Sequence, residues 1–261
     1  MTTPVETLCL VRGGGDLATG VVSRLHHSGY PVIVTELHYP LAVRRSVSVA
    51  SAVFEGNLQI EGMEVHLVNT AEEAIKRSQM GFVSVMISTG IPDVRSSIII
   101  DARIAKTNLD TKITDAELVI GMGPGFEAGE DCHLVVETKR GHSLGRVITH
   151  GRALKDTGIP EPVAGYGESR VLRSPASGQI IWNVNIGDRV EEGQTLGSVN
   201  GIEILGPFNG IVRGLIHPSV TVVEKMKIGD VDPRISNHWN CISDKALAVG
   251  DGVLEAILSW K

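Results

Sequence analysis

The feature that most constrains the fold is a glycine-rich loop between a short apolar strand and a helix. The strand, residues 7–11, runs into Gly13, Gly14 and Gly15, and Ala18 follows in a third small position. This spacing is typical of a turn whose backbone amides meet a phosphate at a helix N-terminus. Gly13 allows the tight turn, Gly15 leaves room for the phosphate, and Ala18 lets the helix pack closely. The loop predicts a phosphate-bearing small molecule as ligand.

Four further residues are predicted to surround this ligand. Asp16 and Leu17 open the helix, and Asp16 is expected to be its N-cap. The second strand ends on Glu36, about 20 residues beyond the glycines, where an acidic side chain either holds a ribose hydroxyl or simply ends the strand. Arg44 is able to neutralise a terminal phosphate, although it also forms a solvated pair with Arg45.

A second glycine-rich loop follows the apolar strand at residues 118–120. Gly123, Pro124 and Gly125 either line the same ligand crevice or form a tight turn. In the polar stretch beyond them, Arg140 is able to grip a phosphate or carboxylate with two hydrogen bonds, and His142 lies beside it. Histidines and carboxylates on one strand point in parallel and do not converge, so no metal site is predicted.

Composition excludes several classes of function. The net charge of −6 and the 4% aromatic content argue against nucleic acid as a partner. No apolar run approaches the roughly 20 residues that cross a bilayer, and the N-terminus lacks the pattern of a signal peptide. The three cysteines form no C-x-x-C pair, so neither a disulfide framework nor a thiolate zinc site is indicated. We expect a cytoplasmic protein with no membrane partner.

Alternating strands and helices in the first part of the chain predict an α/β fold. Short, almost continuously apolar strands are typical of a parallel sheet covered on both faces. We therefore expect a Rossmann-like, mostly parallel sheet domain over residues 1–168 that binds a nucleotide or cofactor. A C-terminal helix over residues 237–261 is expected to pack on this domain.

An internal repeat marks residues 169–236 as a separate small β domain. Residues recur at a constant spacing of 32, as in Pro175 and Pro207 or Gly178 and Gly210. The repeat resembles the biotinyl/lipoyl-like barrel-sandwich domains, whose carrier versions present a modified lysine at the hairpin between the halves. That hairpin falls near residues 199–203, which contain no lysine. A carrier role is therefore not expected.

Four motifs resemble the YqeB-type proteins. They are Gly14-Gly15-Asp16-Leu17-Ala18-Thr19-Gly20, residues 123–131, residues 136–146 and residues 227–234. YqeB-type proteins are described as accessory proteins of the selenium-dependent molybdenum hydroxylase system and are considered beside the XdhC/CoxF maturation factors. The resemblance implies NAD(P) or a molybdopterin-type cofactor as ligand, without deciding between them. It also implies a molybdenum hydroxylase as partner.

The sequence supports three hypotheses of function. The leading hypothesis is an accessory or maturation protein of a molybdenum hydroxylase that binds a phosphate-bearing cofactor at the glycine loop. The first alternative is an NAD(P)-dependent oxidoreductase, for which His133, His142 and Asp101 are the candidate proton donors. The second is a non-enzymatic, nucleotide-sensing docking protein. Catalysis itself and assembly into a homo-oligomer are left open.

Overall fold

The computed structural model describes residues 4–155, 165–235 and 238–260. It divides the chain into two compact units. The first contains residues 1–38, 48–156 and 242–261, and the second contains residues 39–47 and 157–241. These ranges differ from the expected 1–168, 169–236 and 237–261, since the second unit takes in residues 39–47 and its main segment runs from 157 to 241. Residue 237, where the C-terminal segment was expected to begin, lies outside the described residues.

The first unit is built on a nine-stranded sheet with the order β10-β9-β7-β6-β1-β2-β5-β4-β3. Its strands are β1 (Cys9–Arg12), β2 (Val32–Glu36), β3 (Asn57–Ile60), β4 (Met63–Val68), β5 (Val83–Ile87), β6 (Ile98–Asp101), β7 (Leu118–Met122), β9 (Leu134–Val136) and β10 (Val147–Ile148). Strands β4, β5, β2, β1, β6, β7 and β9 run parallel, and β3 and β10 are antiparallel to their neighbours. A separate two-stranded sheet pairs β8 (Glu127–Ala128) with β11 (Gly151–Arg152).

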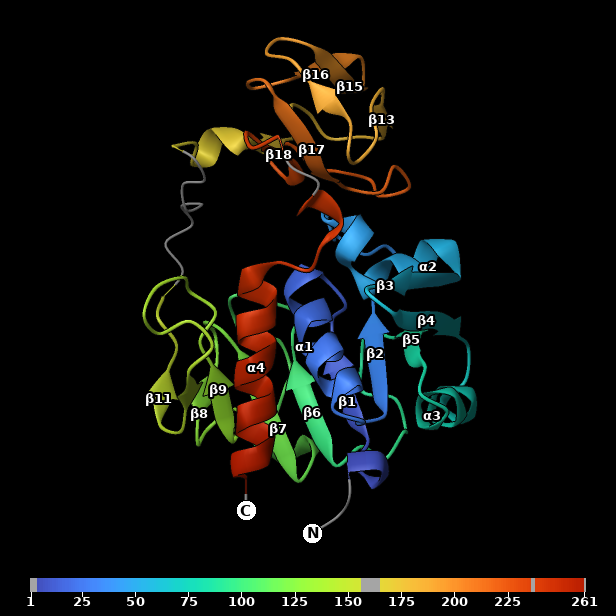
Figure 1. Cartoon of the computed structure of the whole chain (residues 1–261), viewed down its shortest axis with the longest axis vertical. Helices are drawn as coiled ribbons and strands as arrows, with labels where there is room; N and C mark the ends of the chain where they lie inside the picture. Colours follow the sequence, from blue (N-terminus) through green and yellow to red (C-terminus); the bar gives the residue numbers. More distant parts are fainter. Residues whose placement is uncertain (1–3, 156–164, 236–237, 261) are drawn as a thin grey trace. The chain divides into compact units, whose positions relative to one another are not determined.

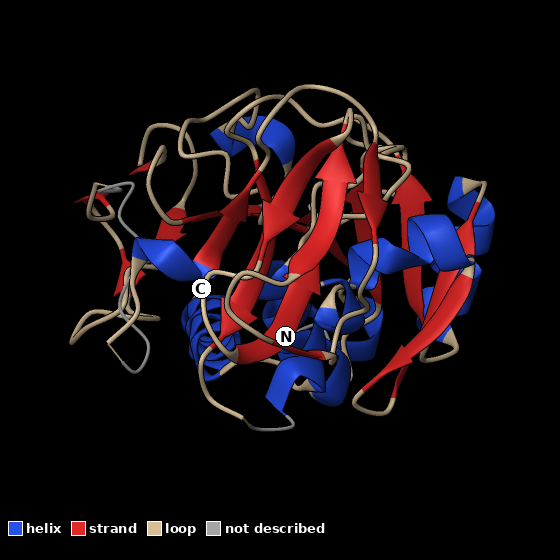
Figure 2. Cartoon of the chain, turned by 90° about the horizontal axis from the view of Figure 1, so that it is seen from above, coloured by secondary structure: helices blue, strands red, loops and turns tan. Residues whose placement is uncertain are grey.

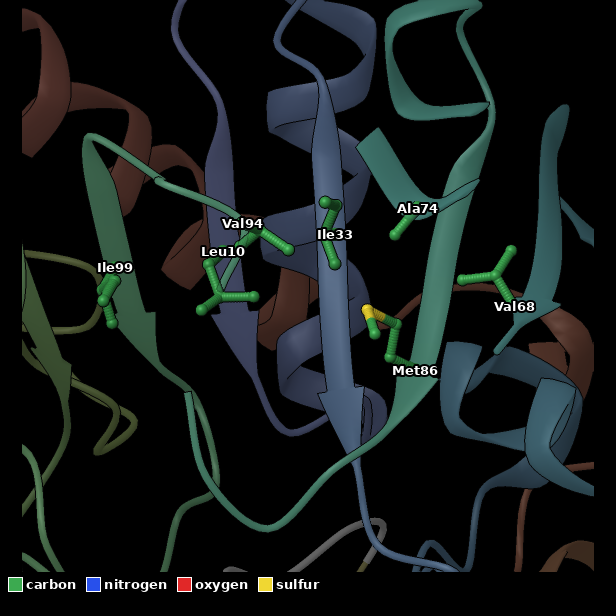
Figure 3. Close-up of a cluster of buried hydrophobic side chains, with 7 residues drawn as sticks. All are labelled: Leu10, Ile33, Val68, Ala74, Met86, Val94 and Ile99. Atoms are coloured by element: carbon green, nitrogen blue, oxygen red, sulfur yellow. The ribbon is translucent and has the colours of Figure 1, made fainter. Parts of the chain in front are cut away.

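The core of the sheet is formed by side chains that match in register across parallel strands. Leu10 on β1 is paired with Ile33 on β2 and with Ile99 on β6, so all three point to the same face. Figure 3 shows them in one buried cluster with Met86 of β5 and with Ala74 of helix α3 (Ala71–Gln79). These apolar runs are buried because β1, β2 and β6 lie in the middle of the sheet.

Two helices far apart in the sequence pack side by side (Figure 1). They are α1 (Asp16–His27) and α4 (Asp244–Ser259). A Cβ on Gly20 of α1 would overlap the carbonyl of Ala246, and one on Gly250 of α4 would overlap the carbonyl of Gly20. The glycines of α4 therefore allow close packing and do not break the helix. A shorter helix, α2 (Ala52–Glu55), precedes the β3–β4 hairpin.

The second unit contains two antiparallel sheets, with orders β12-β18-β17-β14 and β13-β15-β16. The strands are β12 (Val171–Arg173), β13 (Ile180–Trp182), β14 (Arg189–Val190), β15 (Thr195–Val199), β16 (Ile202–Leu205), β17 (Gly210–Leu215) and β18 (Lys227–Asp232). The 32-residue repeat is visible in the pairing, since Val190 pairs with Gly210 as Val222 pairs with Gly178. Segment 39–47 belongs to this unit: Arg45 Nε donates to the carbonyl of Leu215 at 2.7 Å.

The predicted fold class is correct as α/β but wrong in the two folds that it names. A Rossmann-like domain followed by a biotinyl/lipoyl-like domain is not what the chain forms, because it has a large mixed sheet and several small antiparallel sheets. Within the described residues 102–117 and 123–133, β6, β7 and β9 are joined by loops, a single 3-10 turn at Ile113–Asp115 and the short β8, not by covering helices. Figure 2 shows many strands connected by such loops. The second unit also adds β12 and segment 39–47, which lie outside the repeat.

Candidate functional site

The glycine loop lies at the carboxyl end of β1, where the order of the sheet reverses. From β1 the chain passes to β2 and β5 on one side and later returns to β6 on the other side. Open α/β sheets bind ligands outside the carboxyl ends of their strands at such a reversal. The topology thus places the loop at a favourable position for a ligand.

The three glycines of the loop have different surroundings. Gly13 has a φ of +93°, and a Cβ there would lie 3.0 Å from Cα of Arg103. A Cβ on Gly14 would lie 2.9 Å from the amide nitrogen of Ala50, whose N–H donates to the Gly14 carbonyl. Beside Gly15, by contrast, a Cβ would meet nothing within 4 Å. Gly13 and Gly14 are needed for packing, whereas Gly15 borders open space.

Gly15, not Asp16, is the N-cap of α1, so the predicted cap is corrected by one residue. Gly15 has no side chain to accept from the first turn, and the amides of a first turn have no acceptor within their own helix. Thr19 fixes this end of the helix, because its Oγ1 donates to the Gly15 carbonyl at 3.0 Å and accepts the Val49 N–H at 3.0 Å. Ala18 is buried, as its small side chain predicts.

Glu36 is held against the loop by backbone hydrogen bonds. Its Oε2 accepts the N–H of Gly14 at 2.8 Å, and its Oε1 accepts the N–H of Leu37 at 2.7 Å. Burial raises the pKa of Glu36, while the two backbone hydrogen bonds oppose that rise. The Glu36 carboxylate already accepts the N–H of Gly14. A phosphate at this loop would therefore accept hydrogen bonds from the amides farther along, at the start of α1.

A polar cluster lies beside the loop, and Asp101 is its only member that the sequence singled out. Arg12 ends β1 and Asp101 ends β6, and the two residues are partners in the parallel register. Both are almost completely buried, with exposed fractions of 2% and 1%. Thr111 joins them: its Oγ1 accepts from Arg12 Nη1 at 2.7 Å and donates to Asp101 Oδ2 at 2.6 Å.

Arg103 and Asp110 complete this cluster. Arg103 binds Asp101 through Nε at 3.0 Å and Nη2 at 2.5 Å, and the same Nη2 donates to Asp110 Oδ1 at 2.7 Å. Asp110 also accepts from Arg12 Nη2 at 3.0 Å. The hydrogen bond from Arg12 lowers the pKa of Asp110. Charged residues directly after the neighbouring apolar strands were the available sequence signal for Arg12 and Asp101, but Asp110 and Thr111 lie in a loop without such a pattern.

The second glycine loop is explained by close packing. A Cβ on Gly123 would overlap Thr138 Oγ1, and one on Gly125 would lie 2.7 Å from the backbone of Thr107. The carbonyl of Gly125 also accepts the N–H of Asn108 at 3.2 Å. Loop 102–112 contacts Gly13 as well, so it lies between the two glycine loops.

The remaining predicted residues do not gather at the first loop. Arg140 forms a bidentate ion pair with Asp244, with both N–O distances at 2.7 Å. His142 is exposed, and its carbonyl accepts from Arg146 Nε. Arg44 belongs to the second unit, where its Nη2 donates to the carbonyl of Cys241 at 2.9 Å. The structure thus brings together Gly13 to Ala18 and Glu36.

The described part of the chain lacks a metal-ligand cluster and a membrane-spanning helix. It contains no group of three or more His, Cys, Asp or Glu side chains arranged to hold a metal ion. None of its helices has both the length and the apolar character needed to span a membrane.

No model of a known protein family matches the chain. The protein YqeB of Escherichia coli strain K12, however, is 42% identical to it over 255 residues, which are 96% of this chain and 47% of YqeB. The chain is thus similar to YqeB in sequence. It spans about half the length of that relative. The resemblance to YqeB-type proteins is therefore confirmed at the level of sequence.

Two solved structures share weak similarity with the chain. An aspartoacylase family protein of Mesorhizobium loti is 12% identical with a TM-score of 0.30, over 88% of this chain and 86% of that protein. A succinylglutamate desuccinylase/aspartoacylase of Rhodobacter sphaeroides is 12% identical with a TM-score of 0.29, over 86% and 85%. Nothing about function follows from scores of this size.

Proposed function

We propose that the first unit binds a phosphate-bearing cofactor at the glycine loop, and that the chain is an accessory protein in the maturation of a selenium-dependent molybdenum hydroxylase. The observation that carries the binding proposal is the open space beside Gly15, at the N-terminus of α1 and the carboxyl end of β1. The maturation role rests on the four motifs that resemble YqeB-type proteins and on the similarity to YqeB.

The ligand is expected to lie with a phosphate at the start of α1 and with hydroxyl groups toward Glu36. Amides of the first helical turn and the helix dipole attract an anion there. The Glu36 carboxylate repels a second phosphate but has lone pairs left for hydroxyl groups, since each oxygen accepts one backbone N–H. A phosphate group joined to a polyhydroxylated or ribose-like group satisfies both requirements.

The contacts of two candidate proton donors weigh against the oxidoreductase alternative. Asp101 is buried and engaged by Arg103 and Thr111. His133 precedes β9, so it lies at the amino end of that strand, and its Nδ1 accepts the N–H of Val119. Asp101 is therefore committed to its ion pair with Arg103, and His133 lies at the end of the sheet opposite to the glycine loop.

Gly15→Val tests the proposed function. A valine side chain would enter open space, so we expect the variant to fold but to lose binding of the phosphate-bearing ligand by about 100-fold or more, as expected when about 3 kcal/mol of binding energy is lost. Gly90→Val is the matched control, because its Cβ would also meet nothing within 4 Å and Gly90 follows β5, two strands from β1.

The measurement has a chemical and a cellular part. Mass spectrometry of the denatured wild-type protein identifies a co-purified ligand, and titration calorimetry with that ligand compares the variants. In cells that lack this chain, the hydroxylase should be made but inactive, and wild type and Gly90→Val should restore it while Gly15→Val should not. Equal binding by Gly15→Val would refute the ligand site, and an active hydroxylase without the chain would refute the maturation role.

A further inference from the structure

The arginine pair beside the glycine loop has two carboxylate partners of different character. Asp101 is 1% exposed and accepts from Arg103 and Thr111. The side chain of Asp110 is 51% exposed and bridges Arg12 and Arg103 from the solvent side. Asp101 is thus a buried counter-ion of the arginines, whereas Asp110 contacts both arginines from the solvent-exposed side.

The contacts of Asp110 have the geometry of oxyanion recognition. Its Oδ1 lies 2.9 Å from Arg12 Nη1 and 2.7 Å from Arg103 Nη2, and its Oδ2 lies 3.0 Å from Arg12 Nη2. Two guanidinium groups that converge on one pair of oxygens form the kind of site that binds carboxylate or phosphate most specifically. Without Asp110, two positive charges would face one negative charge.

The backbone around Asp110 is fixed independently of its carboxylate. Asn108 Oδ1 accepts the N–H of Thr111 at 2.9 Å, and Asn108 Nδ2 donates to the Thr111 carbonyl at 2.8 Å. Asn108 Nδ2 also donates to Asp131 at 3.0 Å. Rotation of the Asp110 side chain into solvent therefore leaves the loop in place and uncovers both arginines.

We propose that Arg12 and Arg103 form a binding site for a phosphate group, and that the Asp110 carboxylate occupies this site until the phosphate displaces it. The site is separate from the amides at the start of α1, and it rests on the cluster itself rather than on the proposed function. A phosphate is able to replace the carboxylate because it has a further acceptor oxygen for the two guanidinium groups, and as a monoanion it balances the single positive charge that they leave beside Asp101.

The test compares Asp110→Asn with wild type and with Asp93→Asn, a control at another exposed aspartate. The probe is inorganic phosphate, titrated against sodium chloride at constant ionic strength, and the readout is the thermal unfolding midpoint. Asp110→Asn should unfold at a lower temperature without phosphate, because the buried Arg12 loses its charged partner. Phosphate should raise its midpoint more than that of the others, with an apparent Kd about tenfold lower than in wild type.

Equal phosphate shifts in all three proteins would overturn the proposal. Adding Arg103→Lys to Asp110→Asn should remove the extra shift, because lysine lacks the planar fork. Adding Gly15→Val should leave it intact, so the outcome is independent of the glycine-loop ligand. If Asp110→Asn does not fold, the carboxyl ¹³C resonance of Asp110 in the wild type should move toward that of a solvated aspartate as phosphate is added. An unchanged resonance would contradict displacement.

Discussion

His133 shows how one half-buried side chain makes stability depend on pH. Its Nδ1 accepts the N–H of Val119 at 3.0 Å, and its ring packs against Trp260 with centroids 4.8 Å apart. Acceptance at Nδ1 requires an unprotonated nitrogen, and burial lowers the pKa of His133 below its ordinary value of 6.5. The unfolded chain therefore takes up a proton at a higher pH than the folded chain does.

We predict that the wild type loses stability as the pH falls below 6.5 toward the lowered pKa of His133. In His133→Asn, the amide oxygen replaces the Nδ1 acceptor and does not titrate. Urea unfolding at about pH 7.5 and about pH 5.5 should show a smaller loss of unfolding free energy in the variant. The same loss in both proteins would mean that other groups cause the pH dependence.

The sequence could not show which partners several of the predicted side chains bind. Arg140 was expected to hold a ligand, but its Nη1 and Nη2 donate to Asp244, which lies more than 100 positions later in the sequence. Arg44 looked like a neighbour of the loop, yet it donates to Cys241. Partners so distant in sequence leave no local pattern.

At the scale of elements, local rules predicted single helices and strands well. Thr70 and Glu73 have the spacing of a capping box, which predicts a helix over residues 71–79, and the Oγ1 of Thr70 accepts the N–H of Glu73 at 3.2 Å. Alternating apolar residues on both sides of Glu61 and Gly62 predict a hairpin, and β3 and β4 pair around that turn. Loop 102–112 was not predicted, because it contains no repeating apolar pattern and its conformation depends on tertiary ion pairs.

The contact of α1 with α4 gives a prediction at this scale. Gly20→Ala would place a methyl group against the carbonyl of Ala246, so the helices must move apart. We expect a loss of about 1–3 kcal/mol from overpacking, larger than the gain of up to about 1 kcal/mol in helix propensity. Urea unfolding measures the change.

The control for that variant lies on the exposed side of α4. Leu258 is 71% exposed, so Leu258→Ala should change the free energy of unfolding by no more than about 0.5 kcal/mol. Wild-type stability in Gly20→Ala would show that the helices have space to adjust, against the close packing described above.

At the scale of the whole molecule, segment 39–47 is a part of the second unit that lies far from it in sequence. Arg44 and Arg45 donate to carbonyls of Cys241 and Leu215, and Ser46 Oγ donates to the carbonyl of Trp239 at 3.0 Å. The backbone of Val43 packs against Gly214. The predicted domains were continuous ranges of the sequence. Their boundaries therefore placed residues 39–47 in the first domain.

We predict that a fragment of residues 157–241 is poorly stable alone and is stabilised by a synthetic peptide of residues 39–47. Hydrogen bonds from charged donors are worth about 1.5–3 kcal/mol each, so both arginines should matter. Thermal unfolding followed by circular dichroism should show a higher midpoint with the peptide. A peptide with both arginines replaced by alanine should have little effect, and an identical midpoint with and without the native peptide would exclude the role of this segment.

The place of α4 in the chain has a consequence for the order in which the protein is completed on the ribosome. Helix α1 is made early, but the helix that covers its Gly20 face is encoded after the whole second unit. At about 5–20 residues per second, the more than 200 residues between them take at least about ten seconds to synthesise. At the end of that interval, once residue 241 has been added, the second unit has all its segments, whereas the nine-stranded unit still lacks a helix. The unit that carries the glycine loop is therefore finished after the second unit, although its synthesis begins before it.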